Sequence, residues 1–130
     1  RGGFGTEIDY CVMGDAEMSI ALDREKYKPY GLFGGQEGRG SELLINPGKE
    51  DEQWHIRSSG IALQAGSIIR HRTAGGGGYG DPRDRDPAMV SEDYINGLIS
   101  FEDTSAIYAM KLNQDTGEVD LPDTQALRNN

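Results

Sequence analysis

The sequence predicts a mainly β domain with short C-terminal helices (α+β), in which an antiparallel β-barrel or sandwich-like unit precedes two short helices. Runs of alternating apolar and polar residues fall in the first 80 positions, which is typical of half-buried strands. Helix-capping patterns occur only after Gly80. A length of 130 residues suits a single domain over 1–130, with a β part at 1–80 and a helical part at 81–130.

The first two expected strands cover residues 7–13 and 16–23, where apolar side chains recur at every second position. Gly14 and Asp15 between them are a turn signal, so the two runs predict an antiparallel hairpin. Cys11 is the only cysteine, which excludes an internal disulfide and fits a reducing cytoplasm. Its place in a strand-like run predicts a buried, inert thiol.

Residues 26–40 combine five glycines with a proline and three aromatic residues, a density that excludes regular structure. We expect an ordered, irregular loop fastened by Tyr27, Tyr30 and Phe33. Further strands are expected at 42–46 and 67–73, and they complete one antiparallel unit. Between them lie two turn signals, Pro47-Gly48 and Ala65-Gly66, and a weak alternating run at 53–59.

The segment after Gly80 predicts helices near 87–96 and 101–108. Asp86 followed by proline is an N-cap pattern, and Ser100 with Asp103 has the spacing of a capping box. A short strand at 111–113 and a turn follow. The last ten residues could form one or two more helical turns.

Composition excludes some partners. The net charge of −9 and a pI near 4.6 disfavour nucleic acid and anionic membrane surfaces, and no apolar run approaches the roughly 20 residues of a membrane-spanning helix. A hydrophobic fraction of 35% and a mean hydropathy of −0.63 favour a loop-rich fold or a part that packs on a partner.

The first residues show neither an initiator Met nor a signal-peptide pattern, so we expect a piece cut from a longer chain, or a processed one.

Four consecutive glycines at 75–78 precede Tyr79, Gly80 and an Asp-Pro pair. A phosphate-binding loop would need a lysine and a helix here, and a dinucleotide fingerprint would need a helix where Pro82 stands. A flexible linker remains open. We favour an ordered turn over 75–82 that is buried against neighbouring protein and anchored by Tyr79. In this turn several glycines adopt positive φ or leave no room for a Cβ. Valine at Gly76 or Gly77 should then cost about 1–3 kcal/mol, and alanine at a fully buried Tyr79 about 3 kcal/mol.

The stretch GGGGYGDPRDRDPAMVSEDYINGLISFEDTSAIYAMKL resembles the C-terminal segment of the hydantoinase B/oxoprolinase family. The opening RGGFGTEIDY, the block DREKYKPYGLFGGQEG and the ending TGEVDLPDTQALR are similar to family blocks in the same order. The resemblance covers essentially the whole chain. It extends to N-methylhydantoinase, 5-oxoprolinase and the subunits of acetone and acetophenone carboxylases.

The resemblance implies a part of an ATP-dependent cyclic-amide hydrolase or of a related ketone carboxylase. It implies two partners: the rest of a hydantoinase B-type chain, and a hydantoinase A-type ATP-binding subunit that phosphorylates an amide or enolate oxygen. The cofactors it implies, ATP, Mg and a transition metal, are expected on partner chains or an upstream segment, and none in this chain. The implied location is cytoplasmic.

Candidate chemistry within the chain is sparse. His55 and His71 stand in separate weak strands without a second ligand at metal spacing, so we expect no bound metal, His71 exposed on its strand, and His55 at a surface or interface. No serine has the context of a nucleophile elbow, so no catalytic residue is expected.

Eight residues are candidates for facing a substrate cleft or a subunit interface. They are Asp23, Arg24, Tyr30, Phe33, Gly76, Gly77, Tyr79 and Asp81. The plainer interpretation is that the charged members fix loops and that the aromatic members form a small satellite core. The sequence therefore favours a structural or interface domain that is not catalytic alone. The alternative is a free-standing module that binds a small ligand with its glycine-aromatic loops.

Overall fold

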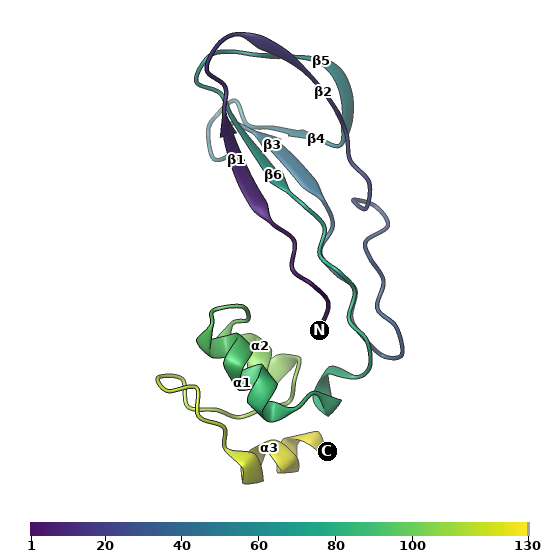
Figure 1. The fold of residues 1–130 in the computed structure, drawn as a ribbon, viewed down its shortest axis with the longest axis vertical. Helices are drawn as coiled ribbons and strands as arrows, with labels where there is room; N and C mark the ends of the chain where they lie inside the picture. The colour runs from purple at the N-terminus through teal and green to yellow at the C-terminus, as the bar shows by residue number, and fades with distance from the viewer. Residues whose placement is uncertain (130) are drawn as a thin grey trace. The chain divides into compact units, whose positions relative to one another are not determined.

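The computed structural model describes residues 1–129 and divides the chain into two compact units (Figure 1). Unit 1 is Arg1–Tyr79 and unit 2 is Gly80–Asn130. The change in composition after Gly80 falls at this boundary. The α+β class is confirmed, with strands in unit 1 and helices in unit 2.

Unit 1 contains two antiparallel sheets. One has four strands in the order β1-β6-β3-β4, and the other pairs β2 with β5. The strands are β1 (Glu7–Cys11), β2 (Ala16–Ala21), β3 (Glu42–Ile45), β4 (Gln53–His55), β5 (Arg57–Leu63) and β6 (Ile68–Arg72). Each of the four strands expected from alternation is present, shortened by one or two residues at its ends.

The predicted hairpin between the first two strands is wrong. β1 pairs with β6, and β2 pairs with β5, so the turn at Gly14 leads from one sheet into the other. The Asp15 carboxylate accepts a hydrogen bond from the Ala65 backbone N–H, and the Gly66 N–H donates to Val12. The alternating pattern identified both strands correctly, but each strand pairs with residues 36 to 65 positions away.

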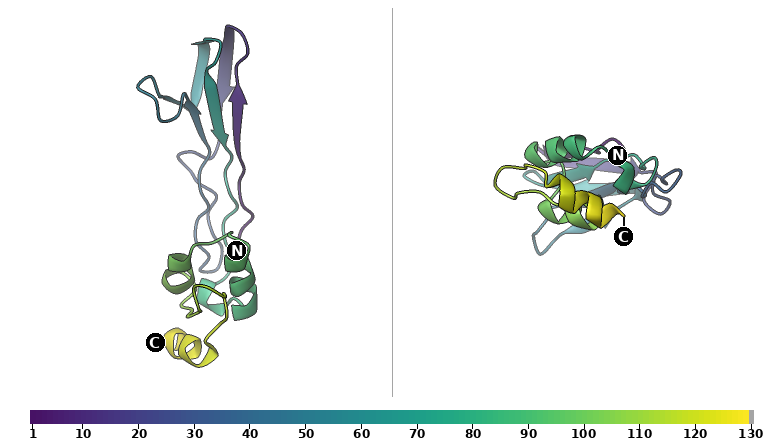
Figure 2. Two further views of the ribbon diagram at one scale, coloured as in Figure 1. Left: turned by 90° about the vertical axis from the view of Figure 1, so that its left-hand side faces the viewer. Right: turned by 90° about the horizontal axis from the view of Figure 1, so that it is seen from below.

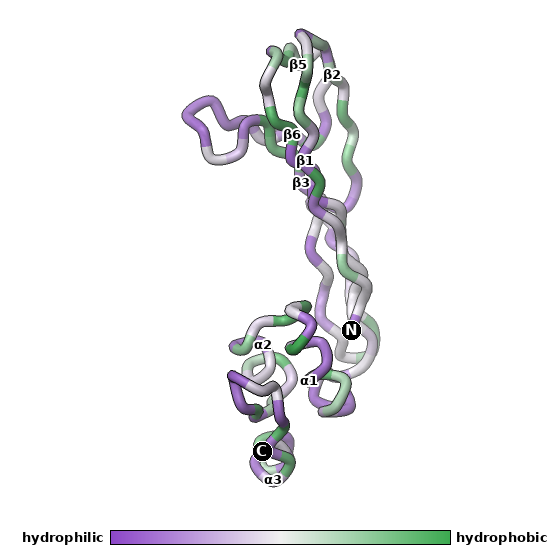
Figure 3. Tube along the Cα trace, turned by 60° about the vertical axis from the view of Figure 1, so that its left-hand side comes forward, coloured by the Kyte–Doolittle hydropathy of each residue, from purple (hydrophilic) through white to green (hydrophobic). Residues whose placement is uncertain are grey.

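The core of unit 1 lies between the two sheets. Leu43 and Ile45 of β3 and Leu63 of β5 are each 6% exposed or less. Partly buried side chains from both sheets pack against them: Val12, Met18, Ile20, Leu22, Ile61 and Ile69. This sandwich-like arrangement confirms the expected fold of the β part, and Figure 3 shows apolar residues gathered on these strands.

Below the sheets, unit 1 continues as a set of extended segments that we call the glycine bundle, residues 1–6, 28–40 and 73–79 (Figure 2). Backbone hydrogen bonds join the segments. The Gly76 N–H donates to Gly3, the Gly78 N–H donates to Gln36, and the Leu32 N–H donates to Gly78, all at 2.8–2.9 Å. The bundle therefore has backbone, not side chains, at its centre.

The approach of these backbones requires glycine. A Cβ at Gly77 would lie 1.9 Å from the carbonyl oxygen of Tyr30, and one at Gly35 would lie 2.2 Å from that of Gly78. The expected turn over 75–82 is wrong in shape at the four glycines, because no turn is assigned at 75–78 and Gly80 alone among the glycines of this segment has positive φ. The expected lack of room for a Cβ is confirmed at Gly77.

Within its described residues, 80–129, unit 2 contains one 3₁₀ turn and three helices. They are η1 (Pro82–Asp84), α1 (Pro87–Ile95), α2 (Phe101–Ala106) and α3 (Leu121–Arg128). Both predicted helices are confirmed, and α3 accounts for the last helical turns. The Asp86 side chain accepts from the Ala88 N–H at 2.8 Å, and Ser100 and Asp103 form the expected reciprocal capping box.

The core of unit 2 is small and apolar. Its buried members are Val90, Tyr108, Met110 and Leu112. Beside it Arg85 forms an ion pair with Asp93 at 2.8 Å, and the two side chains are only 14% and 8% exposed. A buried pair is costly to break, because the remaining charge is left without water.

We expect Gly77→Ala to destabilise unit 1 by about 1–3 kcal/mol, since the new methyl group overlaps a backbone carbonyl that side-chain rotation cannot move. Gly3→Ala is the matched control in the same bundle, because a Cβ there meets nothing within 4 Å. Thermal melting of both variants provides the measurement. Equal melting temperatures would show that the bundle is loose.

Two arginines of one short segment should differ sharply in their contribution to stability. Arg85→Ala should cost about 3–5 kcal/mol because it leaves Asp93 buried. Arg83→Ala should cost far less, since the Arg83–Asp81 pair is exposed at 52% and 40% and is screened by water. Chemical denaturation measures both, and similar losses would contradict the assignment of a buried pair.

Candidate functional site

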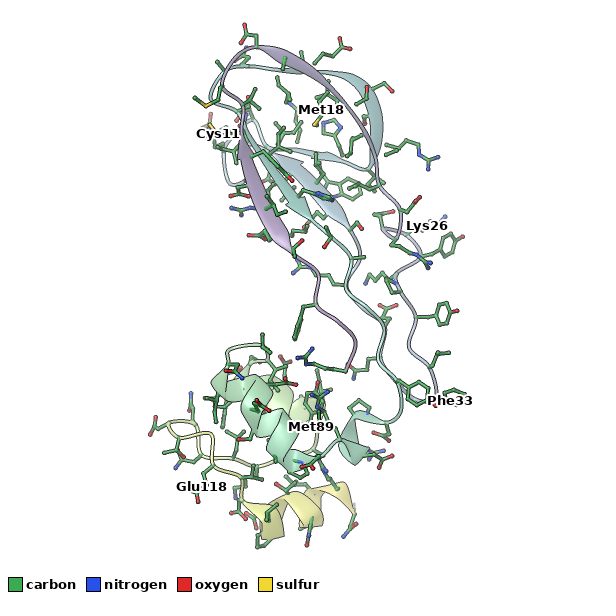
Figure 4. The ribbon with its side chains drawn as sticks, viewed as in Figure 1. Cys11, Met18, Lys26, Phe33, Met89 and Glu118 are labelled. Carbon is green, nitrogen blue, oxygen red and sulfur yellow. The ribbon has the colours of Figure 1, made fainter. Side chains whose placement is uncertain are left out.

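The large side chains of the glycine bundle all point outward. Five of them are 49–78% exposed: Phe4, Tyr30, Leu32, Phe33 and Tyr79. Tyr27, just before the second segment of the bundle, is 76% exposed. Figure 4 labels Phe33 near the end of the loop, away from the sheets. The prediction that aromatic rings fasten this loop is wrong, because the close glycine backbones hold it and leave no interior space for rings. A row of exposed aromatic residues is typical of a protein interface.

Phe33 and Tyr79 form the centre of this surface. Their ring centroids lie 5.2 Å apart, and a parallel bridge joins Leu32 to Tyr79. Phe33 has φ 50°, a left-handed conformation that costs a bulky residue about 1–3 kcal/mol. Tyr79 is 73% exposed in this chain, so its burial against neighbouring protein stays a prediction. The surface is thus built at the expense of backbone strain.

The other candidate residues are spread more widely. Gly77 contacts the backbone of Tyr30, and Gly76 lies beside Gly3. Asp23 and Arg24 are exposed just after β2, and neither has an ion pair within residues 1–129. Asp81 belongs to unit 2, where it caps η1 and pairs with Arg83. Unit 1 therefore gathers Tyr30, Phe33, Tyr79 and the two glycines, but it does not bring the charged candidates to them.

A ladder of ion pairs covers the outer face of the four-stranded sheet. Arg72 pairs with Glu7 and, at 2.7 Å, with Glu42. Arg70 donates two hydrogen bonds to Asp9, at 2.8 and 2.7 Å. This cluster is absent from the expectations drawn from the sequence, although the period-two charges at 7 and 9 and at 70 and 72 are its signal.

The ladder shifts the titration of its members. The hydrogen bond from Arg72 holds the pKa of Glu7 below its ordinary value, and the bonds from Arg70 do the same to the pKa of Asp9. The same bonds raise the pKa of both arginines. In unit 2 the hydrogen bonds from Arg83 lower the pKa of Asp81. These shifts describe ion pairs that fix the sheet, and no acid or base with a pKa near neutrality emerges from them.

Both histidines lie in strands of the four-stranded sheet, His55 in β4 and His71 in β6. His55 makes hydrogen bonds with Ser58 at 3.0 Å and Gln53 at 3.2 Å. His71 is half-buried in β6, so the expectation of an exposed residue is wrong. Among residues 1–129 no three His, Cys, Asp or Glu side chains are grouped to hold a metal ion. None of the helices in this described range is long or apolar enough to cross a membrane.

Comparison with known proteins identifies the family of this chain. The family described as hydantoinase B/oxoprolinase matches residues 1–82. The chain belongs to this family. It is 33% identical over 130 residues to the B-type subunit of a "Putative D-/L-hydantoinase" from Pseudomonas sp. (strain NS671), a match that covers 98% of this chain and 22% of that protein. It is also 41% identical over 91 residues to the acetophenone carboxylase delta subunit of Aromatoleum aromaticum (strain DSM 19018 / LMG 30748 / EbN1), covering 67% of this chain and 13% of that protein.

A solved structure shares the fold of this family member. The crystal structure of the ATP-dependent caprolactamase from Pseudomonas jessenii superposes with a TM-score of 0.73 at 23% identity, over 97% of this chain and 22% of that one. At this identity the likeness shows the fold alone. The chain thus spans less than a quarter of the length of these relatives.

The ion-pair ladder predicts a loss of stability in acid. Glu7 and Asp9 have depressed pKa values in the folded state, so the stability they contribute is present above their ordinary values of 4.5 and 3.8 and is lost as pH falls through the folded values. Melting temperature should therefore drop below about pH 4. Asp9→Asn should flatten that drop, whereas Glu17→Gln, a change at an exposed carboxylate of β2, should leave it unchanged. An unaltered acid slope in Asp9→Asn would contradict the role of the ladder.

Proposed function

We propose that this chain is a structural and interface part of an ATP-dependent cyclic-amide hydrolase of the hydantoinase or oxoprolinase type, or of a related ketone carboxylase, and is not catalytic alone. One observation carries the proposal: a family member that corresponds to only 22% of the D-/L-hydantoinase relative's length presents a row of exposed aromatic side chains. Its partners would be the rest of a hydantoinase B-type chain and a hydantoinase A-type ATP-binding subunit. The relatives' names, which include subunits of caprolactamase and acetophenone carboxylase, support an assembly of several chains.

The chemistry of the described residues supports a non-catalytic role. Residues 1–129 offer no grouped metal ligands. The carboxylates with displaced pKa values are tied to arginines and are not poised for proton transfer. ATP, Mg and a transition metal would accordingly be held by the other parts of the assembly.

The alternative of a free-standing module that binds a small ligand has less support. A small-molecule site is concave and surrounds its ligand. The aromatic side chains of the glycine bundle are instead well exposed, and their backbones are in mutual contact. Such a surface suits a protein partner.

Reconstitution tests the proposal. The 130-residue chain alone should show no ATP-dependent turnover of a hydantoin, 5-oxoproline, a lactam or a ketone substrate. The assembly with the B-type remainder and the A-type partner should turn over one of them and should lose activity when this chain is omitted. Turnover by the chain alone, or full activity without it, would refute the proposal.

The aromatic surface can be tested in the same assembly. Phe33→Ala and Tyr79→Ala should change the melting temperature of the chain little, because both rings are exposed. Each should weaken assembly by about 2 kcal/mol, the effect of an aromatic anchor at an interface. Leu121→Ala removes a side chain that is 54% exposed on α3 and is the control. Equal assembly of all three variants would place the interface elsewhere.

A further inference from the structure

We propose that the free edge of β1 receives a strand from the remainder of the B-type protein, which extends the four-stranded sheet to five. This inference rests on the proposed function, because it names the contact that joins the chain to its partner. β1 is the end strand in the order β1-β6-β3-β4, and all five of its residues are exposed (Figure 1).

The hydrogen bonds beside β1 show which backbone groups are free. The Thr73 N–H donates to Thr6, and the Val12 N–H donates to Ser67. In an antiparallel ladder the residues that bond to the neighbour alternate, so the even-numbered residues of β1 face β6. The N–H and C=O groups of Glu7, Asp9 and Cys11 therefore point outward along the edge. A row of unpaired backbone groups of this kind is a template for another strand.

The other edges of unit 1 are protected and β1 is not. β4 is only three residues long. The register of β2 against β5 shifts between Met18 and Ile20, and Gly60 in β5 has φ 69°. Short strands and irregular register are the usual devices against strand addition. β1 keeps an unbroken register of five residues and contains neither proline nor lysine.

The core of the sandwich is left open beside β1. Ile8 shares a row with His71 and buried Leu43, and Tyr10 shares a row with Ile69 and buried Ile45. Both rows run from the core to the edge, yet Ile8 is 42% and Tyr10 is 50% exposed. An added strand with apolar residues at these two rows would continue the core by one strand.

Charge disfavours a second copy as the occupant in the two antiparallel registers that include Glu7. When β1 pairs antiparallel with a second β1 through all three outward residues, Asp9 lies opposite Asp9. When it pairs through the first two outward residues, Asp9 lies opposite Glu7. Like charges directly opposite are destabilising. The outer face instead favours a strand with basic or neutral polar residues between its apolar ones. The D-/L-hydantoinase relative has 78% of its length outside the matched region, so the remainder of a B-type protein can supply such a strand.

Hydrogen exchange at single-residue resolution on the assembled protein tests the proposal. In the chain's own sheet the amides of Ile8 and Tyr10 are bonded to β6 and should exchange slowly. If a strand is added, the amides of Asp9 and Cys11 should become equally slow. Fast exchange at Asp9 and Cys11 beside slow exchange at Ile8 and Tyr10, in an assembly that retains activity, would overturn this inference while leaving the proposed function intact.

Two variants test the same edge by different means. Cys11→Pro removes an outward N–H group but no hydrogen bond to β6, so it should weaken assembly at least about tenfold. Cys11→Ser keeps this N–H group and should not weaken assembly. Slow exchange at Ile8 and Tyr10 in Cys11→Pro shows that β1 is still folded. Tyr10→Lys should weaken assembly to a similar extent, because it places a charge in the row of side chains that the added strand would cover. Met13→Lys is the control and should not weaken assembly, because Met13 is 88% exposed and lies outside the strand.

A bismaleimide linker identifies the occupant. Cys11 lies on the outer face of the sheet and is exposed, as Figure 4 shows at the top of unit 1. A linked dimer through Cys11 of two copies would overturn the proposal in favour of self-pairing. Assembly of Cys11→Pro and Tyr10→Lys as tight as that of the unaltered chain would likewise overturn it.

Discussion

Contact between glycine backbones is the constraint on which unit 1 depends. Gly77 lies against the carbonyl of Tyr30, Gly35 against Gly78, and Gly2 against Gly76, at separations that exclude a Cβ. Such packing brings three stretches of chain together without burying a side chain. The conformational entropy that glycine loses on folding is high, and hydrogen bonds between the same segments offset part of it. The strained φ of Phe33 is held in place by the same framework.

This framework explains the distribution of apolar surface. A bundle with backbone at its centre must direct every side chain outward, so its aromatic residues are exposed even though the chain has few apolar residues. The limited apolar material elsewhere is divided between two small cores, one between the sheets and one around Val90. Neither core covers Ile8, Tyr10 or Phe33. The chain therefore carries apolar surface that neither of its two cores covers.

Local patterns in the sequence were enough to locate most elements. Alternation identified β1, β2, β3 and β6, and the capping residues Asp86 and Ser100 identified α1 and α2, because these signals act within a few residues. The partners of β1 and β2 could not be read in this way. Strand pairing is decided by contacts between residues 36 to 65 positions apart. The Gly14 turn is equally compatible with a hairpin and with a change from one sheet to the other.

The exposed surfaces were harder to predict for a related reason. Tyr27, Tyr30 and Phe33 among glycines suggest a small core, but rings can enter a core only where the backbone leaves space, and that space depends on which segments approach one another. Cys11 illustrates the same limit: its alternation predicts a strand correctly, yet its burial depends on the strand's place in the sheet. A residue that looks interior in a local pattern can lie at an edge. In this family member the β1 edge and the glycine bundle are the two places where side chains that look interior in the sequence are exposed.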